Sequence, residues 1–103
     1  MANTVNFFDD LEFSTEKVMI KKMLETDMLK EIRICLSKDQ IMKEHIAPAP
    51  IVVMVLDGEI MFNVDGESHT MKKGTAINLD SKVPHSLHAK ENSVIRLSLS
   101  KFQ

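Results

Sequence analysis

Short apolar segments separated by turn residues fill the second half of the chain, and this pattern restricts the fold more than any other feature. The β-branched run IVVMVL (51–56) ends at Asp57-Gly58, and EIMFNV (59–64) ends at Asp65-Gly66. Asp-Gly pairs favour hairpin turns, because these turns need a positive φ angle that glycine adopts without steric cost. Further strands are expected at SHTMKK (68–73), TAINL (75–79), HSLHA (85–89) and SVIRLSLS (93–100). Many short strands separated by turns predict an all-β sandwich or barrel.

The segment 17–38 fits two different structures. Its apolar residues recur at helical spacing, and its lysine, glutamate, methionine and leucine content also favours a helix. In the second interpretation, Glu25-Thr26-Asp27 separates two strands. The run EIRICL (31–36) would then place its apolar side chains on one face and Glu31, Arg33 and Cys35 on the other. Local propensity alone favours the helix.

Length and composition predict a single domain in a reducing compartment. A chain of 103 residues suits one domain, and we divide it into an N-terminal arm (1–16) and one barrel domain (17–103). Cys35 is the only cysteine, so no intramolecular disulfide can form, and a cytoplasmic location is expected. The net charge of −2 indicates neither a nucleic-acid partner nor an anionic membrane. The first residues do not resemble a signal peptide.

Two histidine-containing segments resemble the two motifs of the cupin superfamily, in particular its small single-domain members. In the first motif, His45 matches a histidine and Gly58 the final glycine, whereas Asp39, Ala47 and Ile51 replace a glycine, a histidine and a glutamate. In the second motif the matching residues are Gly74 and His85, and the replaced positions are Asp80, Lys82 and Ala89. The phrases EHIAP, VLDGE and VPHSL also resemble this family.

The resemblance implies an all-β jelly-roll barrel, also described as a double-stranded β-helix, and it favours strands over a helix for 17–38. It further implies a homodimer that forms through a sheet face or an exchanged N-terminal strand. Asp39 tolerates the left-handed conformation better than most residues, so the first turn is expected to survive. Lys82 stands in a loop that is expected to differ from the family's, and the direction of His85 depends on that loop.

Metal-binding cupins use two histidines and a carboxylate from the first motif and one histidine from the second. Here the resemblance leaves only His45 and His85 as ligands for a divalent transition metal ion, because Ala47 and Ile51 cannot coordinate one. A catalytic metal usually needs three protein ligands. His88 is expected to point away from His85, since side chains alternate along a strand.

The expected site is therefore a small pocket inside the barrel with apolar walls and two polar contacts, which is the usual character of a ligand site. Its predicted lining is His45, Ala47, Ile51, Val53, Val55, His85 and Leu87. We predict that it binds a small apolar or amphipathic molecule. A metal-dependent enzyme of dioxygenase or isomerase type, with His45 and His85 as ligands, and an interaction module without a ligand remain as alternatives. No catalytic residue is assigned, and whether a reaction is catalysed stays open.

Overall fold

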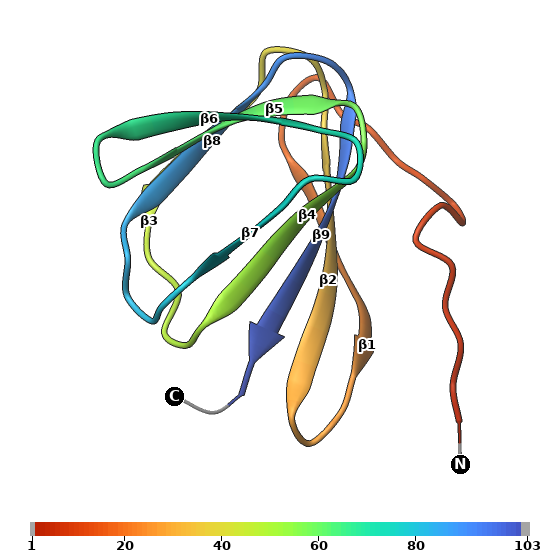
Figure 1. The fold of residues 1–103 in the computed structure, drawn as a ribbon. Helices are drawn as coiled ribbons and strands as arrows, with labels where there is room; N and C mark the ends of the chain where they lie inside the picture. The colour runs from red at the N-terminus through yellow and green to blue at the C-terminus, as the bar shows by residue number, and fades with distance from the viewer. Residues whose placement is uncertain (1, 102–103) are drawn as a thin grey trace.

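The computed structural model of the chain describes residues 2–101, which contain nine β-strands (Figure 1). Their bounds are β1 Met19–Glu25, β2 Leu29–Leu36, β3 Ile41–His45, β4 Ile51–Asp57, β5 Glu59–Val64, β6 Glu67–Lys72, β7 Ala76–Leu79, β8 His85–Ala89 and β9 Ser93–Ser100. Within residues 2–101 there is no helix long and apolar enough to cross a bilayer.

The strands form two antiparallel sheets that pack face to face. One sheet has five strands in the order β1-β2-β9-β4-β7, and the other has four in the order β3-β8-β5-β6. Apart from the hairpins β1-β2 and β5-β6, neighbours in each sheet come from distant parts of the sequence, which is the connectivity of a jelly roll. The predicted all-β jelly-roll barrel is confirmed.

Residues 17–38 form strands and not a helix. β1 pairs with β2 in antiparallel register, with Ile20 opposite Ile34. Ile34 and Leu36 on β2 are buried in the core. This burial explains why the local preference for helix loses, since packing routinely overrides weak local propensity.

The Asp-Gly turns stand where the sequence places them. Gly58 links β4 to β5 with a φ of +92°, and Gly66 links β5 to β6 with a φ of +75°. A β-carbon at Gly58 would also lie only 2.5 Å from the carbonyl oxygen of Asn92, so this position needs glycine for space as well as for conformation.

Apolar side chains from seven strands pack between the two sheets and form one continuous core. These buried residues are Ile34, Leu36, Ile51, Val53, Val55, Ile60, Phe62, Val64, Met71, Leu79, Leu87, Ala89 and Ile95. Most alternate with more exposed neighbours along their strands, as expected where one sheet face is buried.

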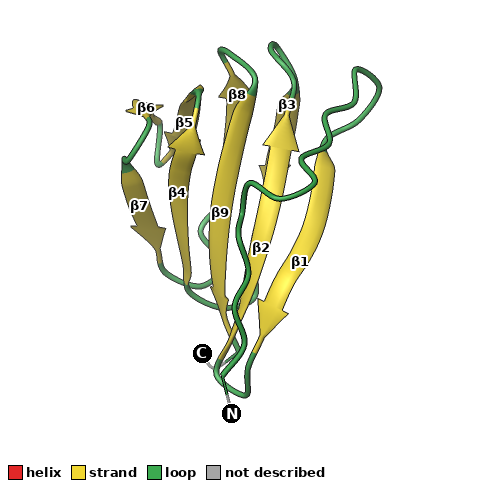
Figure 2. Cartoon of the chain, turned by 90° about the vertical axis from the view of Figure 1, so that its right-hand side faces the viewer, coloured by secondary structure: helices red, strands yellow, loops and turns green. Residues whose placement is uncertain are grey.

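The segment before β1 lies along the outer face of the five-stranded sheet, over β2 and β9 (Figure 2). Arg33 on β2 is only 4% exposed, and its guanidinium donates to the carbonyl oxygens of Phe7 (3.2 Å), Asp9 (2.6 Å) and Asp10 (3.3 Å). Arg96 on β9 lies over the Phe7 ring at 5.4 Å. The arm thus hides one half of this sheet face.

Candidate functional site

A cavity of about 190 Å³ lies between the two sheets. Six residues predicted for the pocket line it, namely His45, Ala47, Ile51, Val53, His85 and Leu87. The seventh, Val55, is fully buried in the core and is not among the lining residues. Apart from the two histidines, the wall is apolar.

The two histidines meet because β3 and β8 are neighbours in the four-stranded sheet. His45, the last residue of β3, is paired with His85, the first residue of β8. The register of β3 shifts between Met42 and His45, a bulge that changes which face the following side chain occupies. The ring centroids lie 4.2 Å apart, with the ring planes at 60° in an edge-on arrangement.

Each ring is fixed by one hydrogen bond to the backbone. Nδ1 of His45 lies 2.7 Å from the carbonyl oxygen of Lys43, and Nδ1 of His85 lies 2.9 Å from that of Val83. A carbonyl oxygen can only accept, so in both rings Nδ1 carries the proton that is donated. In the neutral ring Nε2 is then a free acceptor.

Burial favours the neutral form of His85. The residue is 4% exposed, and its ring is stacked on Phe62 with centroids 5.5 Å apart. Burial lowers the pKa of His85 below its usual value, the nearby His45 lowers this pKa further, and the hydrogen bond to Val83 opposes both. In residues 2–101, no fully buried side-chain nitrogen lacks a hydrogen-bond partner. Only Nδ1 of His85 has such a partner, so Nε2 is not a fully buried atom.

At two motif positions the chain has Asp39 and Lys82 in place of glycine, and both residues have a positive φ. Asp39 adopts a φ of 73° and Lys82 a φ of 64°, both in the left-handed region. The amide of Lys82 donates to the carbonyl oxygen of Ala47 at 2.9 Å, which joins this loop to the cavity wall. In this arrangement His85 points to His45.

The donor set is too small for a catalytic metal centre. Ala47 and Ile51 carry no donor atoms, and no group of three or more histidine, cysteine, aspartate or glutamate side chains in residues 2–101 is arranged to hold an ion. The other two histidines do not join this site. Nε2 of His88 lies 3.6 Å from Oδ1 of Asp39, outside the cavity lining, and His69 is exposed on β6. Two imidazoles alone fall short of the three protein ligands usual in such centres.

Several residues of the wall were not identified from the sequence. These are Ile34, Met42, Ile46, Pro48, Phe62, Ile95, Leu97 and Leu99. The alternation of strand residues could have shown that Phe62, Ile95, Leu97 and Leu99 face inward. It could not have shown that they surround the histidines, because that depends on which strands are neighbours.

Comparisons with known proteins agree with this architecture. The family model of the cupin domain matches residues 33–100. An RmlC-like cupin from Desulfovibrio desulfuricans superposes with a TM-score of 0.88 at 16% identity, covering 97% of both chains. KdgF from Halomonas sp. superposes with a TM-score of 0.82 at 19% identity, covering 100% of this chain and 96% of its own. A conserved protein of unknown function from Streptococcus pyogenes, SPY1581, gives 0.83 at 20% identity, with coverage of 100% and 90%. No curated protein matches the chain.

Proposed function

The chain belongs to the cupin family, and on that premise we propose that its barrel binds one small, mostly apolar molecule that donates hydrogen bonds to His45 and His85. The observation that carries the proposal is a pair of imidazoles, each with Nδ1–H held by a backbone carbonyl, in the wall of an otherwise apolar cavity.

The size of the cavity limits the ligand. Sites for drug-sized molecules measure roughly 300–1,000 Å³, whereas a cavity of roughly 150 Å³ accepts benzene. A cavity of about 190 Å³ therefore suits a single small ring or a short branched chain with a polar group.

The tautomers limit the chemistry of that polar group. In their neutral forms, both rings offer a nitrogen lone pair and no second N–H. A hydroxyl or amine hydrogen can satisfy such a lone pair, but a carboxylate or ketone oxygen cannot. Leaving a desolvated polar group unpaired costs more than a hydrogen bond contributes, so the site is expected to reject acceptor-only ligands.

A metal-dependent enzyme is the competing function. Imidazole Nε2 with Nδ1–H held by a carbonyl is the arrangement found in metal-ligating histidines, and His45 and His85 could hold a divalent transition ion weakly. The remaining positions of the motif supply no further donor, so we place this function second and assign no reaction step to a metal.

The test compares ring compounds of similar size at pH 8 by NMR titration. Phenol is expected to bind about 3- to 10-fold more tightly than toluene, which is the range that one hydrogen bond provides, and benzoate more weakly than either. His85→Phe removes one of the two lone pairs and should reduce the preference for phenol, and His45→Phe combined with His85→Phe should abolish it. His88→Phe, on the same strand but outside the cavity lining, is the matched control.

Two outcomes would contradict the proposal. Equal affinity for phenol and toluene would remove the role of the imidazoles. A stoichiometric divalent metal that survives purification in chelator-free buffer, and is lost in both His45→Ala and His85→Ala, would make these residues metal ligands instead.

A further inference from the structure

A groove of about 510 Å³ lies between the first residues of the chain and the five-stranded sheet. One wall belongs to the arm, which runs over the outer face of β2 and β9 (Figure 2). The sheet contributes Leu24 from β1, Leu29 and Glu31 from β2, and Arg96 from β9. None of these residues lines the cavity of the barrel, so the groove is a separate site.

Glu31 is a buried carboxylate whose two oxygens have different surroundings. The residue is 5% exposed, and Oε1 accepts from Nε of Arg96 at 2.7 Å and from Oγ of Ser98 at 2.8 Å. Within residues 2–101, Oε2 has no hydrogen-bond partner, and no fully buried side-chain oxygen lacks one. Oε2 is therefore open to the groove, where a largely desolvated carboxylate oxygen favours a hydrogen-bond donor.

Arg96 places free donors beside this oxygen. A guanidinium carries N–H groups on Nε, Nη1 and Nη2, and in the described part of the chain only Nε of Arg96 is used. The guanidinium lies over the Phe7 ring at 5.4 Å, which restrains its orientation. Nη1 and Nη2 are thus available for the two parallel hydrogen bonds that arginine makes to a carboxylate.

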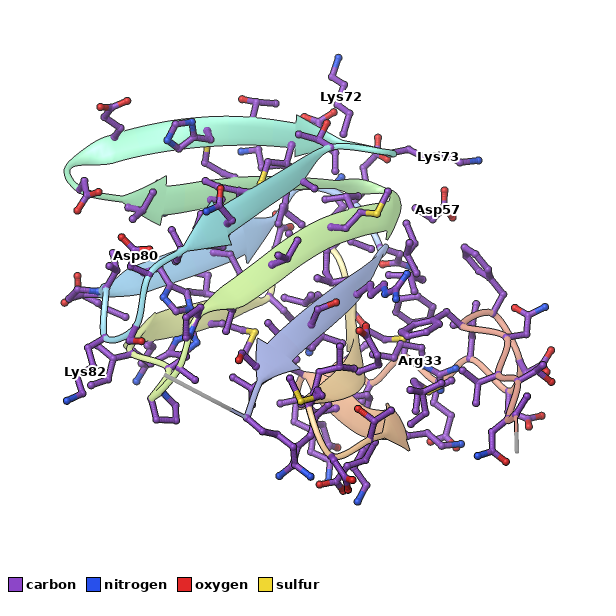
Figure 3. The ribbon with its side chains drawn as sticks, turned by 60° about the horizontal axis from the view of Figure 1, so that its bottom comes forward. Arg33, Asp57, Lys72, Lys73, Asp80 and Lys82 are labelled. Atoms are coloured by element: carbon purple, nitrogen blue, oxygen red, sulfur yellow. The ribbon has the colours of Figure 1, made fainter. Side chains whose placement is uncertain are left out.

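Arg33 does not offer a second site of this kind. It lies between β2 and the arm (Figure 3), where its guanidinium already donates to the carbonyl oxygens of Phe7, Asp9 and Asp10. It is also not part of the groove wall. Arg33 fastens the arm, whereas Arg96 is left with donors for a ligand.

The rest of the groove is apolar, partly because the register of β1 shifts. β1 and β2 pair Lys22 with Ile32 and then Leu24 with Glu31, so the shift turns Leu24 to the face that carries Glu31. On the opposite wall, Val5 is 40% exposed. An apolar group bound here would cover surface that is now in contact with water.

We propose that the groove binds one α-amino acid with an apolar side chain. Its ammonium group donates to Oε2 of Glu31, its carboxylate accepts from Nη1 and Nη2 of Arg96, and its side chain packs between Val5 and Leu24. Glu31 and Arg96 are hydrogen-bonded to each other, so the ligand must carry its two charged groups close together. An α-amino acid does so, because both groups are attached to one carbon atom.

The arm is expected to respond to this ligand. Val5 and Phe7 belong to the arm, whereas Glu31 and Arg96 belong to the sheet, so a ligand in the groove contacts both. A ligand that binds only the closed arrangement stabilises it. Amide exchange in residues 3–7 should therefore slow when the ligand is added.

NMR titration with L-leucine at neutral pH tests the proposal. A Kd of about 1 mM or lower is expected, with shifts at the amides of Val5, Glu31 and Arg96. Isoamylamine has the same apolar chain without the carboxylate, and 4-methylpentanoate has it without the ammonium group. Each should bind at least about tenfold more weakly than leucine, since each loses one charge-assisted contact.

Variants of the two charged residues identify the site. Glu31→Gln and Arg96→Gln should each raise the Kd for leucine by about tenfold or more. Glu91→Gln and Lys90→Gln remove the same charges at exposed positions outside the groove and should leave the Kd unchanged. Circular dichroism checks that each variant is folded.

A variant on the arm keeps the test valid if a sheet variant does not fold. Val5→Asp changes an exposed residue of the groove wall and should weaken leucine binding by about tenfold, because it places a like charge beside the ligand carboxylate. Leu11→Asp, at an arm residue that is 37% exposed and outside the groove, is the matched control and should have no effect.

Any of three results would overturn the proposal. The first is equal affinity for leucine and its two analogues, and the second is a Kd that none of the groove variants changes. The third is the absence of shifts at the groove amides up to about 10 mM leucine, including the case in which only amides of the barrel cavity shift. The binding of phenol in the cavity is a separate measurement, because the two sites share no residue.

Discussion

Lys82 has a φ angle of 64°, which a residue with a β-carbon adopts only at a cost of roughly 1–2 kcal/mol. Replacing it by glycine removes this cost but adds about 0.5–1 kcal/mol of chain entropy in the unfolded state. We expect Lys82→Gly to raise the free energy of unfolding by about 0.5–1 kcal/mol in urea titration. Lys73→Gly, at an exposed lysine without a positive φ, should lower it, and an equal effect of both variants would contradict the argument.

His85 makes stability depend on pH. The pKa of His85 is lower in the folded state than its value near 6.5 in the unfolded chain. At a pH between these two values, the unfolded chain therefore binds more protons at this residue than the folded protein does. Stability from this group is fully present above about pH 6.5 and is lost as the pH falls towards the folded pKa. We expect the urea midpoint to fall between pH 7 and pH 5, and the fall to be smaller in His85→Phe. His88→Phe is the control, and an unchanged profile in His85→Phe would refute this role.

The spacing of two motifs was sufficient to predict that His45 and His85 meet, although they lie on different strands. It could not predict the fixed tautomers, because these depend on where the carbonyls of Lys43 and Val83 point. Val55 was placed in the pocket by alternation with Ile51 and Val53. Alternation gives the face of a strand but not the depth at which its side chains meet the opposite sheet.

Among the strands, those from β4 onward could be predicted closely because Asp-Gly turns and β-branched runs mark their ends. β3 was missed. Its sequence IMKEH does not alternate regularly, most of its residues are exposed at an edge, and the register shift before His45 breaks the period. β1 and β2 could be assigned only from the resemblance, since their residues prefer a helix locally.

The arm depends on β2 through Arg33. We expect Arg33→Gln to lose two or more charge-assisted hydrogen bonds and to lower the free energy of unfolding by about 2–3 kcal/mol. Amide exchange in residues 7–10 should approach the unfolded rate while β4 and β9 stay protected. Lys21→Gln, an exposed neighbour near Arg33, should leave both quantities unchanged.

Cys35 provides a second measurement of the same contact. The thiol is 1% exposed beneath the arm, and burial raises its pKa although Arg33 opposes the shift. Release of the arm in Arg33→Gln should speed its reaction with a thiol reagent by about tenfold or more, because the reagent gains access to the thiol. If exchange and thiol reactivity stay at wild-type values, Arg33 does not fasten the arm.

For the whole molecule, the last strand is central to the five-stranded sheet. β9 lies between β2 and β4, pairing Ile34 with Ile95 on one side and Val55 with Ile95 on the other. Without β9, the hairpin of β1 and β2 has no hydrogen-bonded neighbour in the rest of the barrel. Folding therefore depends on long-range pairing, which predicts slow refolding, in roughly milliseconds to seconds.

Truncations from the two ends should consequently have opposite outcomes. A chain that begins at Lys17 keeps all nine strands and loses only the contacts of the arm, so it should unfold cooperatively at a lower temperature than the wild type. A chain that stops at Asn92 loses β9, and with it the burial of Ile95 and the link between β2 and β4. We expect it to show neither a cooperative transition nor a dispersed NMR spectrum. Cooperative unfolding of the chain that stops at Asn92, or its absence in the chain that begins at Lys17, would mean that the arm and not β9 holds the barrel together.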